Sequence, residues 1–163
     1  MTLPLFSGYL LDADFIIGLG RRFNPLEMRV KAREIVEDLI AQSRIKSAAE
    51  VYFELSNKAK NSGDEPLAWC DNHRDIFEDL TEGVQFCLAS VLATFEGMVK
   101  SDMGVFDADP ILVAMALDSG WTIVTRDGSG ANPSATGIHV VCEHFDVRCV
   151  TDFEFLKENG WTV

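Results

Sequence analysis

The stretch YLLDADFII, residues 9–17, places three apolar or aromatic residues before a pair of aspartates and further apolar residues behind them. Tyr9 to Leu11 have the composition of a short buried strand, and Asp12 directly follows that strand. A carboxylate is costly to remove from water unless it is paired or binds a metal ion. A functional role for Asp12 is therefore favoured if other acids in the chain arrive at strand ends in the same way.

Alternating strands and helices are predicted along the rest of the chain. NPLE, residues 24–27, is a helix start, with Asn24 as cap and Pro25 in the first turn. Asp109 followed by Pro110 predicts another start, with Asp109 as the cap. Such alternation predicts a three-layer α/β/α fold with a central, mainly parallel sheet. The further strands are expected at 44–48, 121–125, 138–142 and 147–151, and the further helices at 47–61, through most of 64–100, and from 152.

One segment of the middle region has two interpretations. GVQFCLAS, residues 83–90, alternates enough to form a strand, although the surrounding residues favour a helix. SVLATFEGMVK, residues 90–100, is the clearest helical segment there.

Length and charge limit the classes of protein to consider. With 163 residues we expect a single domain over 1–163, and a net charge of -12 argues against a broad basic surface for nucleic acid. The start of the chain has no basic segment followed by a long apolar run, so we expect a cytoplasmic protein without a membrane partner. The four cysteines form no C-x-x-C pair and are expected to be free thiols in a reducing compartment. His139, Cys142, His144 and Cys149 are close enough in sequence to suggest a zinc site, but their spacing matches no common zinc module.

Several acids are expected to meet at one edge of the sheet. Asp12 and Asp127 each follow a predicted strand, and Asp109 opens a helix. Glu50 and Glu54 are four residues apart and so share one helical face. Ligand sites of open α/β sheets lie beyond the carboxyl ends of the strands. Grouped carboxylates repel one another unless cations neutralise them, and oxygen ligands suit Mg²⁺ or Mn²⁺, ions well matched to phosphodiester hydrolysis.

The sequence resembles the PIN-domain ribonucleases. YLLDADFII, EVYFEL, DADPILVAMAL and WTIVTRD follow one another in the order and spacing of that family. The tail HVVCEHFDVRCVTDFEFLKENGW is similar to a PIN-like subfamily of unknown function. The resemblance covers nearly the whole chain and implies an α/β/α protein that binds Mg²⁺ or Mn²⁺ and cuts single-stranded or structured RNA. Many bacterial members are toxins of toxin–antitoxin pairs, so an antitoxin protein and a homodimer are the implied partners besides RNA.

The resemblance also implies which residues form the site. Its catalytic and metal-binding acids fall on Asp12, Glu54, Asp109 and Asp127, with Glu50 as an alternative to Glu54 one helical turn away. Two acids depart from the family pattern and are second-rank candidates for the site, Asp14 and Asp107. Basic residues near these acids are candidates to contact RNA phosphates, or else ordinary surface charges: Arg21, Arg22, Lys58, Lys60 and Arg126.

Two other functions remain open. LLDADFII also resembles the first motif of haloacid-dehalogenase-type phosphatases, in which Asp12 would be the nucleophile and Asp14 the general acid. Phe15 departs from that motif, which usually has a small residue at this position. The chain could also be a non-catalytic PIN-like module that binds a partner, although all four family acids are present.

Overall fold

A five-stranded parallel sheet forms the centre of the described structure, a computed structural model that describes residues 7–19, 26–58, 65–95, 108–126 and 137–161. The strand order is β3-β2-β1-β4-β5, and all four pairings are parallel. The strands are β1 (Tyr9–Leu11), β2 (Ile45–Ala48), β3 (Phe77–Glu78), β4 (Thr122–Val124) and β5 (Cys149–Val150).

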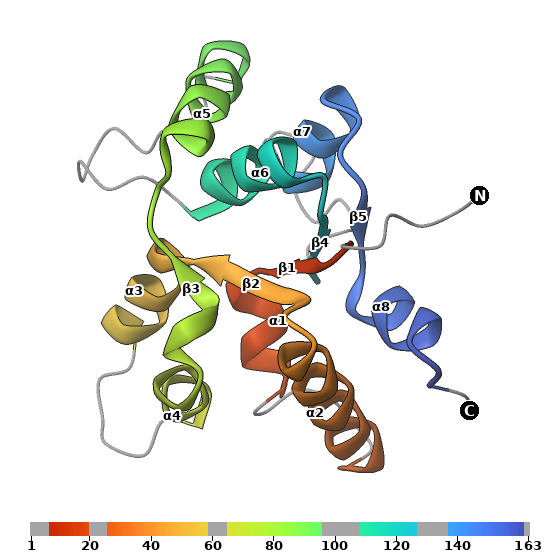
Figure 1. The fold of residues 1–163 in the computed structure, drawn as a ribbon. Coiled ribbons are helices and arrows are strands. Elements are labelled where there is room, and N and C mark those ends of the chain that lie inside the picture. The colour runs from red at the N-terminus through yellow and green to blue at the C-terminus, as the bar shows by residue number, and fades with distance from the viewer. Residues whose placement is uncertain (1–6, 20–25, 59–64, 96–107, 127–136, 162–163) are drawn as a thin grey trace.

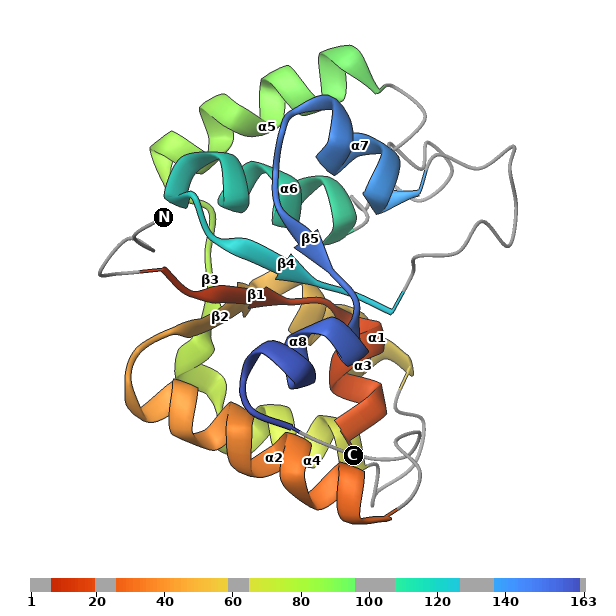
Figure 2. The ribbon, with the colours of Figure 1, turned by 90° about the vertical axis from the view of Figure 1, so that its right-hand side faces the viewer.

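Helices cover both faces of this sheet (Figure 1). In the two ribbon views α5, α6 and α7 lie on one side, and α1, α2, α4 and α8 lie on the other (Figure 2). The arrangement confirms the predicted three-layer α/β/α class. The helices are α1 (Ala13–Ile17), α2 (Leu26–Ala41), α3 (Ala49–Lys58), α4 (Glu65–Asn72), α5 (Glu82–Thr94), α6 (Ala108–Ser119), α7 (Ile138–His144) and α8 (Asp152–Glu158), with the 3₁₀ turn η2 (Arg74–Ile76) before β3.

Residues 138–142 form a helix, so the prediction of a strand there is wrong. They belong to α7, in which Ile138, Val141 and Cys142 are buried while Val140 is 53 % exposed. Buried residues three and four positions apart form one stripe along a helix. In the sequence, the β-branched residues of this short segment favour a strand and so obscure the helical spacing.

The two-way interpretation of residues 83–90 is decided in favour of a helix. The segment lies in α5, where Val84, Leu88 and Val91 are buried at helical spacing. Thr81 caps this helix by accepting a hydrogen bond from the Val84 backbone N–H over 3.2 Å. α5 ends at Thr94, and residues 96–100 of the predicted helical segment lie outside the described residues.

The start of α6 differs from its prediction by a small shift. α6 begins at Ala108, so Asp109 lies inside the first turn and is not the cap. A carboxylate in the first turn still faces the positive end of the helix dipole. Asn24 and Pro25, the predicted start of α2, lie outside the described residues.

Helix α8 is held against the start of β1 by a group of polar and aromatic side chains. The Tyr9 hydroxyl donates a hydrogen bond to Glu158, and Asn159 Nδ2 donates to the same hydroxyl over 3.2 Å. Arg148 Nη1 donates to Glu158 Oε1 over 3.1 Å. The Tyr9 ring also meets Phe155 edge-on, with 4.8 Å between the ring centroids. These contacts fix the C-terminal part of the chain to the central strand.

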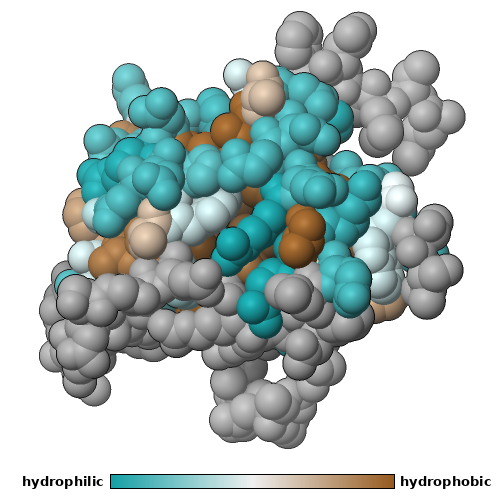
Figure 3. Space-filling model, turned by 90° about the horizontal axis from the view of Figure 1, so that it is seen from below, coloured by the Kyte–Doolittle hydropathy of each residue, from teal (hydrophilic) through white to brown (hydrophobic). Residues whose placement is uncertain are grey.

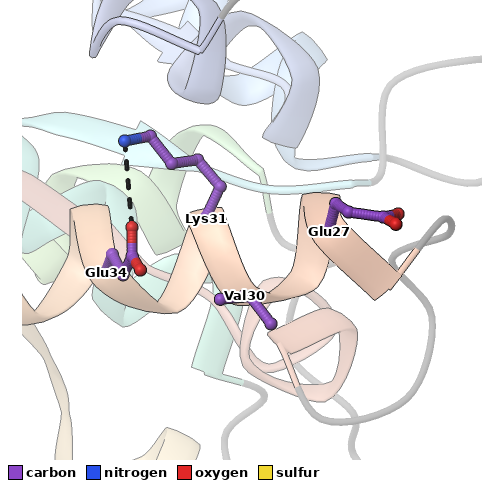
Figure 4. Close-up of a pocket in the computed structure, with 4 residues that line it drawn as sticks. All are labelled: Glu27, Val30, Lys31 and Glu34. Atoms are coloured by element: carbon purple, nitrogen blue, oxygen red, sulfur yellow. Dashed lines mark ion pairs between the residues drawn. The ribbon is translucent and has the colours of Figure 1, made fainter.

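The side of the molecule that carries α2 exposes mainly hydrophilic residues with apolar ones between them (Figure 3). An open depression of about 300 Å³ lies on the outer face of α2, where Lys31 and Glu34 form an ion pair of 3.8 Å (Figure 4). A second depression, of about 220 Å³, is lined in part by Lys46, Asp118 and Trp121. None of the candidate acids lines either depression. Among the described residues, no helix is long and apolar enough to cross a membrane.

Candidate functional site

Asp12 ends the central strand and begins a helix. Its Oδ1 accepts hydrogen bonds from the backbone N–H groups of Asp14, over 2.6 Å, and Phe15, over 3.2 Å. Asp12 is thus the N-cap of α1, a role in which its side chain satisfies two helix-end donors. The residue is only 5 % exposed. The strand-end carboxylate predicted from YLLDADFII is therefore present and buried.

Burial raises the pKa of Asp12 to about 6, and the nearby charge of Asp14 adds to this effect. Hydrogen bonds from Thr125 and from the backbone of Phe15 and Asp14 act in the opposite direction but do not cancel it. In the described part of the chain, no cationic side chain contacts Asp12. Among the residues that the structure describes, none supplies a compensating positive charge to this buried carboxylate.

Two buried hydroxyl groups complete this edge of the sheet. Thr125, the residue after β4, donates its hydroxyl hydrogen to Asp12 Oδ2, and its backbone N–H donates to the Val150 carbonyl over 3.0 Å. Ser47 donates to the Leu11 carbonyl over 2.6 Å. Both residues are fully buried. The sequence reasoning missed them because it searched for charged groups, although a hydroxyl residue at the end of the apolar strand WTIVT was a usable signal.

The acids of α3 lie next to the same edge, because this helix begins directly after β2. Glu50 and Glu54 are both partly buried, as the shared helical face predicts. Glu50 Oε2 is buried and has no hydrogen-bond partner among the described residues. Asp14 and Asp109 are also partly buried, in the first turns of α1 and α6.

The other candidates cannot be placed in the site. Within the described ranges, no group of three or more His, Cys, Asp or Glu side chains is placed to hold a metal ion, and this includes His139, Cys142, His144 and Cys149. The convergence of all four family acids is therefore a prediction still. The candidates outside the described residues are Asp127, Asp107, Arg21, Arg22 and Lys60, and of Lys58 only the backbone, at the end of α3, is described.

Arg126 has a partner that was not expected. Its Nε lies 3.0 Å from Oδ2 of Asp152, the first residue of α8. Asp152 was missed as a site candidate, although it follows the strand 149–150 by the same rule that singled out Asp12. Arg126, a predicted contact for RNA phosphate, is therefore already engaged with a carboxylate.

The donor chemistry at this edge fits a divalent cation. Asp12 offers a buried carboxylate that no described cation contacts, and Glu50 offers a buried oxygen without a described hydrogen-bond partner. Carboxylate oxygens are the ligands that Mg²⁺ and Mn²⁺ prefer, and a bound cation would supply the missing positive charge. Asp12 and Glu50 are the described residues whose buried oxygens would hold it, and the convergence of Glu54 and Asp109 with them stays a prediction.

Residues 9–163 match a family described as "Domain of unknown function (DUF4411)". The chain belongs to the DUF4411 family. No curated protein matches it significantly. Among solved structures, its fold is similar to a chain of VapBC2 from Rickettsia felis. That crystal structure shows VapBC2 bound to a DNA fragment from the VapBC2 promoter. The similarity has a TM-score of 0.52 at 14 % identity and covers 88 % of this chain and 97 % of that one. The PIN-like fold predicted from the sequence is thereby confirmed for this DUF4411 chain.

Proposed function

We propose that this DUF4411 chain is a metal-dependent endoribonuclease and the toxin of a toxin–antitoxin pair. The observation that carries the proposal is the Asp12 carboxylate, buried at the end of the central strand with no cation of the described residues in contact. A chain retains such a group against its cost in stability when the group serves a site. The PIN-like fold and its similarity to VapBC2, a toxin–antitoxin complex, support the reaction class.

Each acid has a stated role in this proposal. Asp12, Glu54, Asp109 and Asp127 are the catalytic and metal-binding acids, and Glu50, Asp14 and Asp107 add charge or further ligands. Bound Mg²⁺ or Mn²⁺ supplies Lewis acidity toward the scissile phosphate and lowers the pKa of the attacking water. Thr125 and the backbone of α1 hold the Asp12 carboxylate in a fixed orientation.

The test is cleavage of a 5′-labelled single-stranded RNA by purified protein. We expect cleavage with Mn²⁺ or Mg²⁺, none with EDTA, and at least a roughly hundredfold loss in Asp12→Asn. Glu34→Gln on the exposed face of α2 loses the same charge and should cut normally. Undiminished cleavage in Asp12→Asn would exclude this residue as a ligand. Capture of phosphate at Asp12, without RNA cleavage, would instead favour the phosphatase alternative.

The antitoxin is tested separately. We expect a small protein encoded next to this gene to co-purify with the chain and to inhibit its cleavage of RNA. Because the net charge of the chain is -12, the contacting segment of that partner should be basic. RNA cleavage by a chain for which no such partner protein exists would support the proposed nuclease activity and contradict the proposed toxin–antitoxin role.

A further inference from the structure

A tight turn joins the end of helix α7 to the start of strand β5 (Figure 2). The Val147 backbone N–H donates to the Cys142 carbonyl over 2.8 Å. The Asp146 N–H donates to the Glu143 carbonyl over 3.3 Å, and Asp146 has a left-handed φ of 55°. These features form a Schellman motif, a common way for a helix to end. The motif brings Cys142, in the last turn of α7, next to the chain that enters β5.

Two cysteine side chains meet across this turn. Cys149 is the first residue of β5 and lies two positions after Val147, the spacing that puts side chains on the same side of a strand. The Cys149 thiol donates a hydrogen bond to Cys142. Cys142 is 1 % exposed, whereas Cys149 is partly exposed, and both are free thiols. A sulfur that solvent can reach is therefore in contact with a buried one.

Ordered backbone on both sides holds the two sulfurs together. Cys149 is opposite Ile123 in the pairing of β4 with β5, and the Ile123 N–H donates to the Arg148 carbonyl over 3.0 Å. On the other side, Cys142 belongs to α7 and is part of the hydrophobic core. A disulfide bond requires a close approach of the two side chains, which this turn supplies without a rearrangement of either element.

We propose that Cys142 and Cys149 are a redox modification site, at which a low-molecular-weight disulfide converts the two thiols into a disulfide bond within one chain. The proposal goes beyond the proposed function and does not depend on it, since neither cysteine is a candidate ligand of the cation.

The reaction is a thiol–disulfide exchange in two steps. The Cys149 thiolate attacks one sulfur of the oxidant and expels the other half as a thiolate, which leaves a mixed disulfide. The Cys142 thiolate then attacks the Cys149 sulfur and expels the second half. Two electrons pass to the oxidant, whose two thiolates take up the two protons that the cysteines lose. The second step is fast because Cys142 is already in contact with Cys149.

The first step is slow because the Cys149 thiol is hard to ionise. The hydrogen bond to Cys142 and burial raise the pKa of Cys149, and the charges of Asp12 and Glu154 act in the same direction. The thiolate is the attacking form, so exchange near neutral pH is slow. The pair therefore stays reduced in a reducing compartment and responds to a sustained excess of oxidised thiols.

The test is incubation of the folded, full-length chain with oxidised glutathione in mildly alkaline buffer, followed by alkylation of free thiols and mass mapping of peptides. We expect a bond between Cys142 and Cys149 within one chain, with the loss of two hydrogen atoms and no bound glutathione. Cys142→Ala should keep glutathione on Cys149, because no second thiol expels it. Cys149→Ser should form no disulfide at Cys142.

The wild-type map decides the outcome even if Cys142→Ala fails to fold. An unmodified pair, or glutathione retained on Cys149 of the wild type, would overturn the proposal, because the two sulfurs would then not exchange. A disulfide from Cys142 or Cys149 to any other cysteine, or to another chain, would overturn it as well.

The matched control is Cys87→Ser in α5. Cys87 is also partly exposed and burial also raises its pKa, so its loss should leave the rate of bond formation unchanged within about twofold. The bond between Cys142 and Cys149 closes a short loop and should raise the melting temperature by roughly 5 °C, an increase that a reducing agent reverses. An unchanged or lower melting temperature would contradict a disulfide that fits the native turn.

Discussion

The hydroxyl of Thr125 donates a hydrogen bond to the carboxylate of Asp12, and so joins the ends of β4 and β1. The two residues are 113 positions apart in the chain and both are buried. The hydrogen bond favours the charged carboxylate, whereas burial favours the protonated one. Burial dominates and leaves the pKa of Asp12 at about 6, so the structure predicts how stability and metal binding respond to pH.

Asp12→Asn should stabilise the metal-free protein at neutral pH. The folded pKa of about 6 is above the ordinary value of 3.8, so the folded state binds the proton more tightly, and stability falls as pH rises between these values. The penalty is fully present above about pH 6 and absent below about pH 4. Asparagine keeps the shape of the side chain and removes its charge. The free energy of unfolding of Asp12→Asn, relative to that of wild type, should therefore increase by about 2–3 kcal/mol from pH 4 to pH 7.5.

Thermal melts in EDTA at those two pH values measure this change. Asp38→Asn, on the exposed side of α2, is the control and should show no comparable pH-dependent gain. An equal difference between wild type and Asp12→Asn at both pH values would mean that Asp12 is not destabilised by its burial.

Thr125→Val should move Mn²⁺ binding to higher pH. The variant has nearly the same volume but lacks the hydroxyl that stabilises the Asp12 carboxylate, so the pKa of Asp12 should rise further. Because the metal binds the deprotonated carboxylate, the midpoint of Mn²⁺ affinity against pH should rise as well. Thr122→Val, at the opposite end of β4, tests for a general effect of valine and should leave that midpoint in place. Identical midpoints in both variants would remove Thr125 from the site.

The sequence was sufficient for the framework of the site but not for its detail. YLLDADFII predicts β1 and the acid that follows it, because an apolar strand and an adjacent acid are both local signals, whereas the burial of Asp12 is known from the structure. The N-cap role of Asp12, its hydrogen bond to Thr125 and the Arg126–Asp152 pair depend on strand neighbours that are distant in sequence. IHVVC was assigned to a strand because five residues rich in valine cannot distinguish a buried helical stripe from a strand.

The two glutamates of α3 can be separated by their substitutions. If Glu54 is the family ligand, Glu54→Gln should reduce RNA cleavage at least about a hundredfold. Glu50→Gln should weaken Mn²⁺ binding about tenfold, because the buried oxygen Oε2, unpartnered among described residues, is suited to support the cation. Glu143→Gln on the exposed side of α7 is the control. The reverse ranking in cleavage would assign the catalytic role to Glu50.

Tyr9→Phe should destabilise the protein by about 1–2 kcal/mol without affecting the cation site, because it removes the hydroxyl that joins β1 to Glu158 and Asn159.

Burial acts to raise the pKa of Glu158, but hydrogen bonds from Arg148 and Tyr9 outweigh it and lower this pKa below 4.5. The contribution of Glu158 to stability is therefore present above pH 4.5 and is lost as pH falls through the lowered pKa. Urea unfolding should show a smaller loss between pH 7 and pH 3 in Tyr9→Phe than in wild type. Tyr52→Phe removes the exposed hydrogen bond to Asp71 and should cost less than Tyr9→Phe, so equal losses from the two tyrosines would contradict the anchoring role of Tyr9.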